Sequence, residues 1–169
     1  MLSRNPLIAH RLGAALLLSA LATPVLAQGL VAWDTTAGWD VLIDPSLGNG
    51  CLIQSEFTDG SVVRIGFDLT EGMGYVTAFN EAWGAIEEGK TYPVSFTLDS
   101  EEYEAEAKGI YLEGVPGADI YFDNEEFLFD IAARQTMVLS HDGAEVMSID
   151  LTGSAAALTD AIACQEAQG

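Results

Sequence analysis

The sequence predicts a mainly β protein: an antiparallel sandwich or an open barrel, with one short internal helix and a C-terminal helix tied to the sheet by a disulfide. Three observations lead to this prediction. Short apolar or alternating runs are separated by Gly, Asn and Asp residues, which is typical of antiparallel strands joined by turns. The last segment is rich in Ala and Leu, as a helix is. The chain carries two cysteines, and one of them lies in that segment.

The first strands are expected in the stretch WDVLIDPSLGNGCLIQSEFTDGSVVRIGFDL, which contains three short runs of this kind. Residues 45–50 separate the first run from the second, and Asp59-Gly60 separates the second from the third. Asn-Gly and Asp-Gly pairs favour type I′ turns, because both central residues of that turn adopt positive φ. The stretch therefore predicts hairpins at Asn49-Gly50 and at Asp59-Gly60.

Two further strands are expected over residues 75–79 and 92–98, with Gly72 and Gly74 marking a turn before the first of them. A last hairpin is expected in TMVLSHDGAEVMSIDL, where residues 142–143 form another Asp-Gly pair. Each of these runs alternates or is short and apolar, which is typical of strands.

The segment SEEYEAEAKGIYL, residues 100–112, is ambiguous. Its Glu and Lys residues favour a helix by intrinsic propensity. Its pattern alternates, however, with Glu102, Glu104 and Glu106 on one side and small or aromatic residues on the other. We interpret the segment as a strand with a solvated acidic face.

Two helices complete the prediction. In NEEFLFDIAARQ, Asn124 is expected to cap a short amphipathic helix whose apolar stripe consists of Phe127, Leu128 and Ile131. In LTGSAAALTDAIACQ, Ser154 is expected to be the N-cap. The small alanines of that helix would let it lie close to a sheet.

Residues 1–27 have the pattern of a secretory signal peptide. Arg4 and Arg11 precede or flank the apolar run 12–21, and small residues end at Ala27. The run is shorter than the roughly 20 apolar residues that a membrane span needs. We therefore expect export and cleavage, a single acidic β-rich domain over residues 28–169, a periplasmic or secreted location, and no membrane span after cleavage.

The charge of the expected mature chain excludes one class of partner. Residues 28–169 keep all 26 acidic residues and only Arg64, Lys90, Lys108 and Arg134 as bases, so their formal charge is −22. Such a surface repels phosphate instead of releasing counterions from it. We expect no nucleic-acid partner. The expected binding partner is an unknown envelope or extracellular protein, and a cationic protein is one candidate.

Cys51 and Cys164 are expected to form a disulfide. Both follow the predicted cleavage site, and exported cysteines in an even number usually pair. The bond would join the first third of the domain to its last helix. Closing a loop of this length stabilises a fold by up to about 5 kcal/mol in the chain-entropy model.

The sequence offers no recognisable catalytic or metal-binding constellation, so we predict no catalytic residues, no metal site and no cofactor. His141 is the one histidine after residue 27, and it stands between Ser140 and Asp142. Neighbours on a strand point to opposite faces, so these three do not form a triad. The stretch GADIYFDNEEF contains Asp119, Asp123 and two further oxygen ligands but lacks the order of a calcium loop.

Seven aromatic residues could line a ligand groove, although most are expected to pack in the core or at its rim. They are Trp33, Trp39, Trp83, Tyr92, Tyr103, Tyr111 and Tyr121.

The chain resembles a group of small exported bacterial proteins of unknown function. The resemblance rests on Trp39 before a strand, Cys51 opening the next, Asn80 and Trp83 in the middle, and the ending SIDLTGSAAALTDAIACQ, a Leu-x-Gly-Ser motif followed by an Ala/Leu helix and a last cysteine. The chain is more distantly similar to the invasion-associated locus B type of periplasmic β-protein, without that family's number of cysteines or its motifs. The resemblance implies a periplasmic β-domain with a terminal helix and no catalytic residues.

Three functions are consistent with these features. The first is a non-enzymatic periplasmic or secreted domain that binds a partner or supports the cell envelope. The second is an inhibitor of a cationic protein such as lysozyme, through electrostatic steering by an acidic face. The third is a cell-wall glycoside hydrolase that uses a carboxylate pair. The residues of the candidate acidic face are Glu87, Glu88, Glu101, Glu102, Glu104 and Glu106.

Overall fold

The computed structural model describes residues 29–84, 86–124 and 126–168, so the signal peptide predicted over residues 1–27 lies outside the described residues. Ten strands and two α-helices form within them. They are β1 (Val31–Thr36), β2 (Trp39–Asp44), β3 (Gly50–Glu56), β4 (Val62–Asp68), β5 (Met73–Phe79), β6 (Thr91–Leu98), β7 (Glu101–Leu112), β8 (Val115–Phe122), α1 (Glu126–Ala132), β9 (Thr136–His141), β10 (Ala144–Asp150) and α2 (Ser154–Gln168). Short 3₁₀ turns lie at Pro45–Leu47 and Glu81–Trp83.

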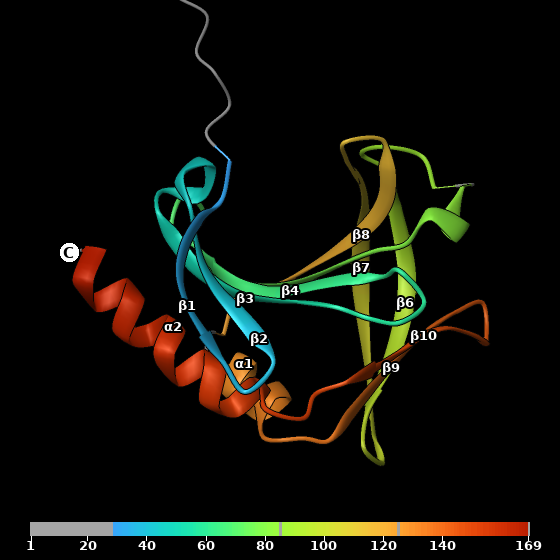
Figure 1. The fold of residues 1–169 in the computed structure, drawn as a ribbon. Helices are drawn as coiled ribbons and strands as arrows, with labels where there is room; N and C mark the ends of the chain where they lie inside the picture. The colour runs from blue at the N-terminus through green and yellow to red at the C-terminus, as the bar shows by residue number, and fades with distance from the viewer. Residues whose placement is uncertain (1–28, 85, 125, 169) are drawn as a thin grey trace, which may run out of the picture.

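All ten strands belong to one antiparallel sheet, in the order β1-β2-β3-β4-β5-β8-β7-β6-β9-β10. β1 and β10 form its two edges, so the sheet is open (Figure 1). The predicted mainly β class, the short internal helix and the C-terminal helix are confirmed. The two alternatives of the prediction, a sandwich and an open barrel, resolve into a single curved, open sheet.

One face of the sheet, which we call the inner face, carries the hydrophobic core. Ladder pairs place Ile53 opposite Ile65, Ile65 opposite Val76, and Val76 opposite Ile120, so these side chains share that face. α2 contacts β1 to β4, and α1 contacts β5 and α2. Burying each large aliphatic side chain here stabilises the fold by about 1.5–3 kcal/mol. The opposite face is called the outer face below.

The three predicted hairpins form, but only one has the predicted turn. Asp142 and Gly143 both adopt positive φ, 51° and 75°, as a type I′ turn requires. At the second hairpin Gly60 alone has positive φ, and at the first Gly50 already belongs to β3. The type I′ prediction is wrong at these two sites, because aspartate side chains hold longer loops: Asp59 Oδ1, for example, accepts from the amide of Ser61 at 3.0 Å.

Two strands, β1 and β8, were not predicted. Each is joined to a neighbour by a two-residue turn with positive φ at both positions, Ala37-Gly38 and Glu113-Gly114. A non-Asn, non-Asp residue at the first position of such a turn is a weak sequence signal. The hairpins were therefore missed.

The prediction that Gly74 belongs to a turn is also wrong. Gly74 lies inside β5, and a Cβ atom on it would lie 2.8 Å from Cδ1 of Leu128. Leu128 is a fully buried residue of α1. The glycine therefore lets α1 approach the sheet closely.

The ambiguous segment 100–112 forms a strand, β7, as predicted. Glu102, Glu104 and Glu106 point outward and are exposed, whereas Ala107 is buried on the inner face. β7 pairs with β6 on one side and with β8 on the other. These ladder hydrogen bonds override the helix propensity of the glutamates.

The internal helix and its cap are confirmed. Asn124 Oδ1 accepts from the amide of Glu126 at 3.0 Å, and Leu128 and Ile131 are buried. In contrast, the prediction that Ser154 caps α2 is wrong. The carbonyl of Gly153 accepts the helical hydrogen bond from Ala157, at 3.2 Å. The Ser154 hydroxyl donates instead to the carbonyl of Ala132 at 3.3 Å, which connects the start of α2 to the end of α1.

The predicted disulfide between Cys51 and Cys164 is confirmed, and it joins β3 to α2. Both cysteines are buried, and their Cα atoms are 6.2 Å apart. Gln165 Oε1 accepts from the amide of Cys51 at 2.9 Å, and Trp39 Nε1 donates to the carbonyl of Thr152 at 3.0 Å. The Thr36 hydroxyl on β1 also donates to Asp160 Oδ2 on α2, so a covalent bond and several hydrogen bonds hold α2 and the residues just before it to the sheet. No helix in the described part of the chain is both long and apolar enough to cross a membrane.

We expect the disulfide to stabilise the fold strongly, because its sequence separation is 113 residues. The double variant Cys51→Ala, Cys164→Ala should lose about 2–5 kcal/mol of unfolding free energy in urea titrations. Reducing the wild-type protein should lower its stability to the level of the variant, and the same reductant should leave the variant unchanged. Thiol labelling of the denatured, oxidised protein should detect no free cysteine, and two labelled thiols would contradict the pairing.

Candidate functional site

The six glutamates of the predicted acidic face lie in different places. Glu102, Glu104 and Glu106 alternate along the outer face of β7 and are exposed. Glu87 and Glu88 belong instead to the loop before β6, which covers the inner face of β7: a Cβ atom on Gly109 would lie 2.3 Å from the carbonyl oxygen of Glu87. The structure therefore brings only the outer-face glutamates of β7 onto one surface.

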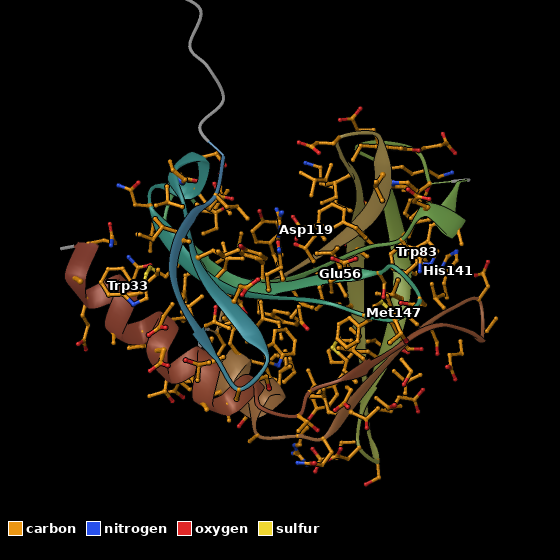
Figure 2. The ribbon with its side chains drawn as sticks, viewed as in Figure 1. Trp33, Glu56, Trp83, Asp119, His141 and Met147 are labelled. Atoms are coloured by element: carbon orange, nitrogen blue, oxygen red, sulfur yellow. A yellow bond between two sulfur atoms is a disulfide. The ribbon has the colours of Figure 1, made fainter. Side chains whose placement is uncertain are left out.

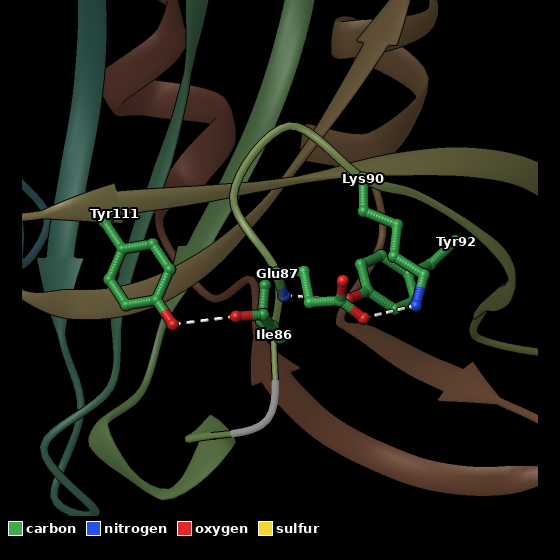
Figure 3. A network of polar contacts seen from close by, with 5 residues as sticks. All are labelled: Ile86, Glu87, Lys90, Tyr92 and Tyr111. Atoms are coloured by element: carbon green, nitrogen blue, oxygen red, sulfur yellow. Dashed lines mark hydrogen bonds and ion pairs between the residues drawn. The ribbon is translucent and has the colours of Figure 1, made fainter.

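Two of the six glutamates form ion pairs. Glu101 Oε2 accepts from the Arg134 guanidinium at 2.9 Å, and Glu87 Oε1 accepts from the Lys90 ammonium at 2.6 Å (Figure 3). Exposed pairs of this kind contribute at most about 1 kcal/mol to stability. They do, however, neutralise Glu101 and Glu87 locally.

Beside Glu104 and Glu106, the outer face of β7 and β8 forms an open hollow of about 470 Å³, which we call the acidic hollow. Four carboxylates and a single ammonium group line it. Figure 2 shows Asp119, one of the four, on the side of the sheet away from α1. The lining residues are Thr91, Glu104, Ala105, Glu106, Lys108, Asp119, Tyr121, Phe122 and Asp123.

Asp119 belongs to a row of polar residues that crosses the outer face. The ladders place Gln54 opposite Arg64, Arg64 opposite Thr77, Thr77 opposite Asp119, and Asp119 opposite Lys108. Directly opposed residues lie on the same face of the sheet and close together. The row therefore leads from β3 into the acidic hollow.

The cations of this row do not neutralise Asp119. Arg64 Nε donates to Gln54 Oε1 at 2.8 Å, and the guanidinium lies 5.4 Å from the centre of the Phe79 ring. Burial lowers the pKa of Arg64. Among the residues that the structure describes, no cation lies within 4 Å of the Asp119 carboxylate, although Lys108 is its ladder partner.

Asp119 is held in surroundings that disfavour its charge. Burial is the main influence and raises the pKa of its carboxyl group. The Thr77 hydroxyl donates to Asp119 Oδ1 at 2.5 Å. This hydrogen bond, the nearby Tyr121 hydroxyl and the charge of Lys108 lower the pKa of Asp119, but not enough to offset burial. Asp119 is thus an incompletely stabilised carboxylate at the acidic hollow.

Asp68, on β4, shows the opposite balance. It is only 2% exposed, and burial alone would raise its pKa. Its Oδ1 atom accepts from the Thr70 hydroxyl at 2.6 Å, from the Thr70 amide at 2.8 Å and from the Glu71 amide at 3.2 Å. Together with Tyr121, these donors hold the pKa of Asp68 below its ordinary value. Asp68 therefore stabilises the turn between β4 and β5.

Tyr121 connects the two carboxylates. Its hydroxyl donates to Asp68 Oδ2 at 3.1 Å. Burial, and then the neighbouring charges of Asp119 and Asp68, raise the pKa of Tyr121. The hydroxyl therefore stays protonated and acts as a donor at neutral pH.

This arrangement suits binding of a cationic group better than acid–base catalysis. Glycoside hydrolysis needs two carboxyl groups that both reach the substrate, and Asp68 cannot be one of them because it is buried and occupied by its donors. No group of three or more His, Cys, Asp or Glu residues within the described ranges is placed to hold a metal ion. A guanidinium or ammonium group would find several carboxylate acceptors in the hollow.

Sequence reasoning identified only part of this site. It singled out Glu104 and Glu106 through their alternation. It considered Asp119 and Asp123 only as possible calcium ligands, in a stretch that lacks the residue order of a calcium loop. It did not single out Thr77. The pairing of β5 with β8, which places Thr77 opposite Asp119, joins strands far apart in the chain. No local pattern reveals it.

No family model matches the chain, and no curated protein matches it. Among solved structures, the crystal structure of invasion associated protein B from Bartonella henselae is similar in fold, with a TM-score of 0.56 and 14% sequence identity. The match covers 79% of this chain and 97% of that chain. At this identity the likeness shows the fold alone. At the level of fold it agrees with the resemblance to the invasion-associated locus B type of protein.

Proposed function

We propose that the mature chain is a non-enzymatic, exported protein that binds a cationic protein partner through the acidic hollow. The observation that carries the proposal is Asp119, a carboxylate whose charge burial disfavours and which forms no ion pair within 4 Å among the described residues, although the charge of Lys108 favours it from farther away. Ionisable groups whose pKa is shifted by burial and neighbouring charges, and which lie in a hollow, are candidates for functional sites.

A basic side chain of a partner would supply the counter-charge that Asp119 lacks. Glu104, Glu106 and Asp123 surround the same hollow, so a guanidinium or ammonium group entering it would meet acceptors on several sides. Outside the hollow, the formal charge of −22 on residues 28–169 would steer a cationic protein toward the surface. More specifically, we propose that the partner is a lysozyme-like protein and that binding inhibits it.

Export is supported by two features. The signal-peptide pattern of residues 1–27 predicts it, and the Cys51–Cys164 bond is of a kind that persists in oxidising compartments such as the periplasm or the extracellular medium. The resemblance of the sequence to small exported bacterial proteins points the same way. No observation on the described residues favours the glycoside hydrolase.

We expect the mature protein to bind lysozyme in low salt and to reduce its activity. The double variant Glu104→Gln, Glu106→Gln should lower the affinity by about tenfold in calorimetric titrations, because two acceptors at the hollow lose their charge. The matched control is Glu145→Gln, Glu166→Gln, which removes the same charge from exposed residues on β10 and α2. It should lose clearly less affinity.

The complex should also weaken as the pH falls through the raised pKa of Asp119, since a protonated carboxyl group no longer pairs with a cation. Asp119→Asn should remove this part of the pH dependence. Unchanged lysozyme activity with excess protein in low salt, or an equal loss in the control variant, would refute the assignment of the hollow to this partner.

We expect opposite stability effects at the two linked aspartates. The pKa of Asp68 is lowered in the folded state, so its contribution is present at neutral pH and is lost as the pH falls through that pKa. Asp68→Asn should therefore lower the free energy of unfolding at pH 7 by about 1–3 kcal/mol, and this loss should shrink in acid.

For Asp119 the stability contribution changes with pH in the opposite direction. Its pKa is raised in the folded state, so the stability that it contributes is present at low pH and is lost as the pH rises through the folded pKa. Asp119→Asn keeps an acceptor for Thr77 without the charge, so it should leave the stability at pH 7 unchanged or raise it. Urea titrations at several pH values measure both variants. A loss at pH 7 as large as that of Asp68→Asn would show that Asp119 has a structural role instead.

A further inference from the structure

A second hollow lies on the inner face, at the end of the sheet away from α2. It is a cavity of about 300 Å³ with an almost entirely apolar lining. Val94, Ala107, Ala118 and Leu139 line it from the strands, and Val146 from β10. Trp83 and His141, which line it from the connection before β6 and from the end of β9, are labelled in Figure 2.

The wall that Trp83 and Ile86 provide is fastened to the sheet. The hydroxyl of Tyr111 donates to the carbonyl of Ile86 at 2.7 Å, and the hydroxyl of Tyr92 accepts from the amide of Glu87 at 2.8 Å (Figure 3). The amide of Gly109 donates to the carbonyl of Lys90 at 2.8 Å. Three hydrogen bonds therefore hold the segment that forms this wall of the cavity against the sheet.

This apolar hollow is partly open to solvent, so a small ligand can reach it. Alanines at positions 107 and 118 line it from the inner face, and the ladder partners of Ala118 are the small residues Ala78 and Gly109, so little side-chain volume fills this part of the sheet. A cavity of about 150 Å³ already accommodates benzene, and ligand pockets begin at about 300 Å³. A single aromatic ring with a short substituent therefore fits.

The polar groups at the cavity define the charge of a suitable ligand. His141 Nδ1 lies 2.8 Å from the carbonyl oxygen of Pro93, which can only accept, so Nδ1 carries a hydrogen. The Asp142 carboxylate lies 3.5 Å from the other ring nitrogen, Nε2, and is exposed beside the cavity. Lys90, which lies 5.2 Å from the centre of the Tyr92 ring, is already paired with Glu87. An ammonium group is favoured at His141 and Asp142, and an anion is disfavoured.

We propose that this cavity binds a hydrophobic amine. Its aromatic or branched aliphatic body lies against Trp83, Val94 and Ala107, and its ammonium group pairs with the Asp142 carboxylate beside His141. This site is on the opposite face of the sheet from the acidic hollow and does not depend on the function proposed for that hollow.

A matched series of three ligands tests the proposal: 2-phenylethylamine, 2-phenylethanol and phenylacetate, which share a ring and differ in charge. Calorimetry measures affinity for the mature protein, and ¹H–¹⁵N spectra locate binding through the indole N–H of Trp83. We expect saturable one-to-one binding of the amine, weaker binding of the alcohol, and no binding of the acid at the same concentrations. The Trp83 signal should shift with the amine.

Two variants separate the cavity from the headgroup site. Ala107→Leu fills the cavity and should lower the affinity for amine and alcohol alike by about tenfold or more. Its matched control is Ala155→Leu, the same substitution at an exposed residue of α2 that does not line the cavity. Asp142→Asn preserves the turn, because Asn also tolerates positive φ. It should lower the affinity for the amine by about two- to fivefold and leave the alcohol unchanged.

Several outcomes would overturn the proposal. They are no saturable binding of the amine, phenylacetate binding as tightly as the amine, or amine binding that is the same in Ala107→Leu as in the wild type. Spectral shifts centred on Asp119 and Tyr121 would place the amine in the acidic hollow and likewise overturn it. If Ala107→Leu fails to fold, the ligand series, the Trp83 shift and Asp142→Asn still decide between these outcomes.

Discussion

The bond between Cys51 and Cys164 fixes α2 across β2 and β3, and the distribution of polar and apolar surface depends on that attachment. A single sheet has two faces, and α1 and α2 contact it on the inner face at β1 to β5. Ser154 joins α2 to α1 by a hydrogen bond to Ala132, and Gly74 lets α1 lie against β5. Disulfide, helices and sheet thus form one packed unit at this end of the molecule.

Two consequences follow for the remainder of the surface. The outer face carries a polar row whose aspartate, Asp119, opens into the acidic hollow. At the far end of the inner face, Ala107, Ala118 and the segment containing Trp83 line a partly open apolar cavity. One site is wet and charged and the other is apolar, which suits ligands of different chemistry. Both have acidic surroundings, so both favour cations over anions.

The sequence predicted the features that local patterns encode. Alternation predicted β7 against the helix propensity of its glutamates, an Asp-Gly pair predicted the turn at 142–143, and export predicted the disulfide. Features that depend on distant contacts were missed or wrong. Gly74 resembled a turn residue because the approach of Leu128 cannot be seen locally, and Ser154 resembled a cap because the Ala132 carbonyl that it contacts lies 22 residues away. The environment of Asp119 likewise depends on the pairing of β5 with β8.

Burial makes the charged form of Asp119 unfavourable, and our central claim is that a cationic partner binds this carboxylate. A ¹³C titration of the aspartate carboxyl groups by nuclear magnetic resonance tests this claim most directly, with and without lysozyme. The account predicts that the pKa of Asp119 in the free protein lies above those of the exposed aspartates, and that it falls when lysozyme is added, because a bound cation favours the charged form. An Asp119 that titrates in the ordinary range, with a pKa that lysozyme does not change, would contradict it.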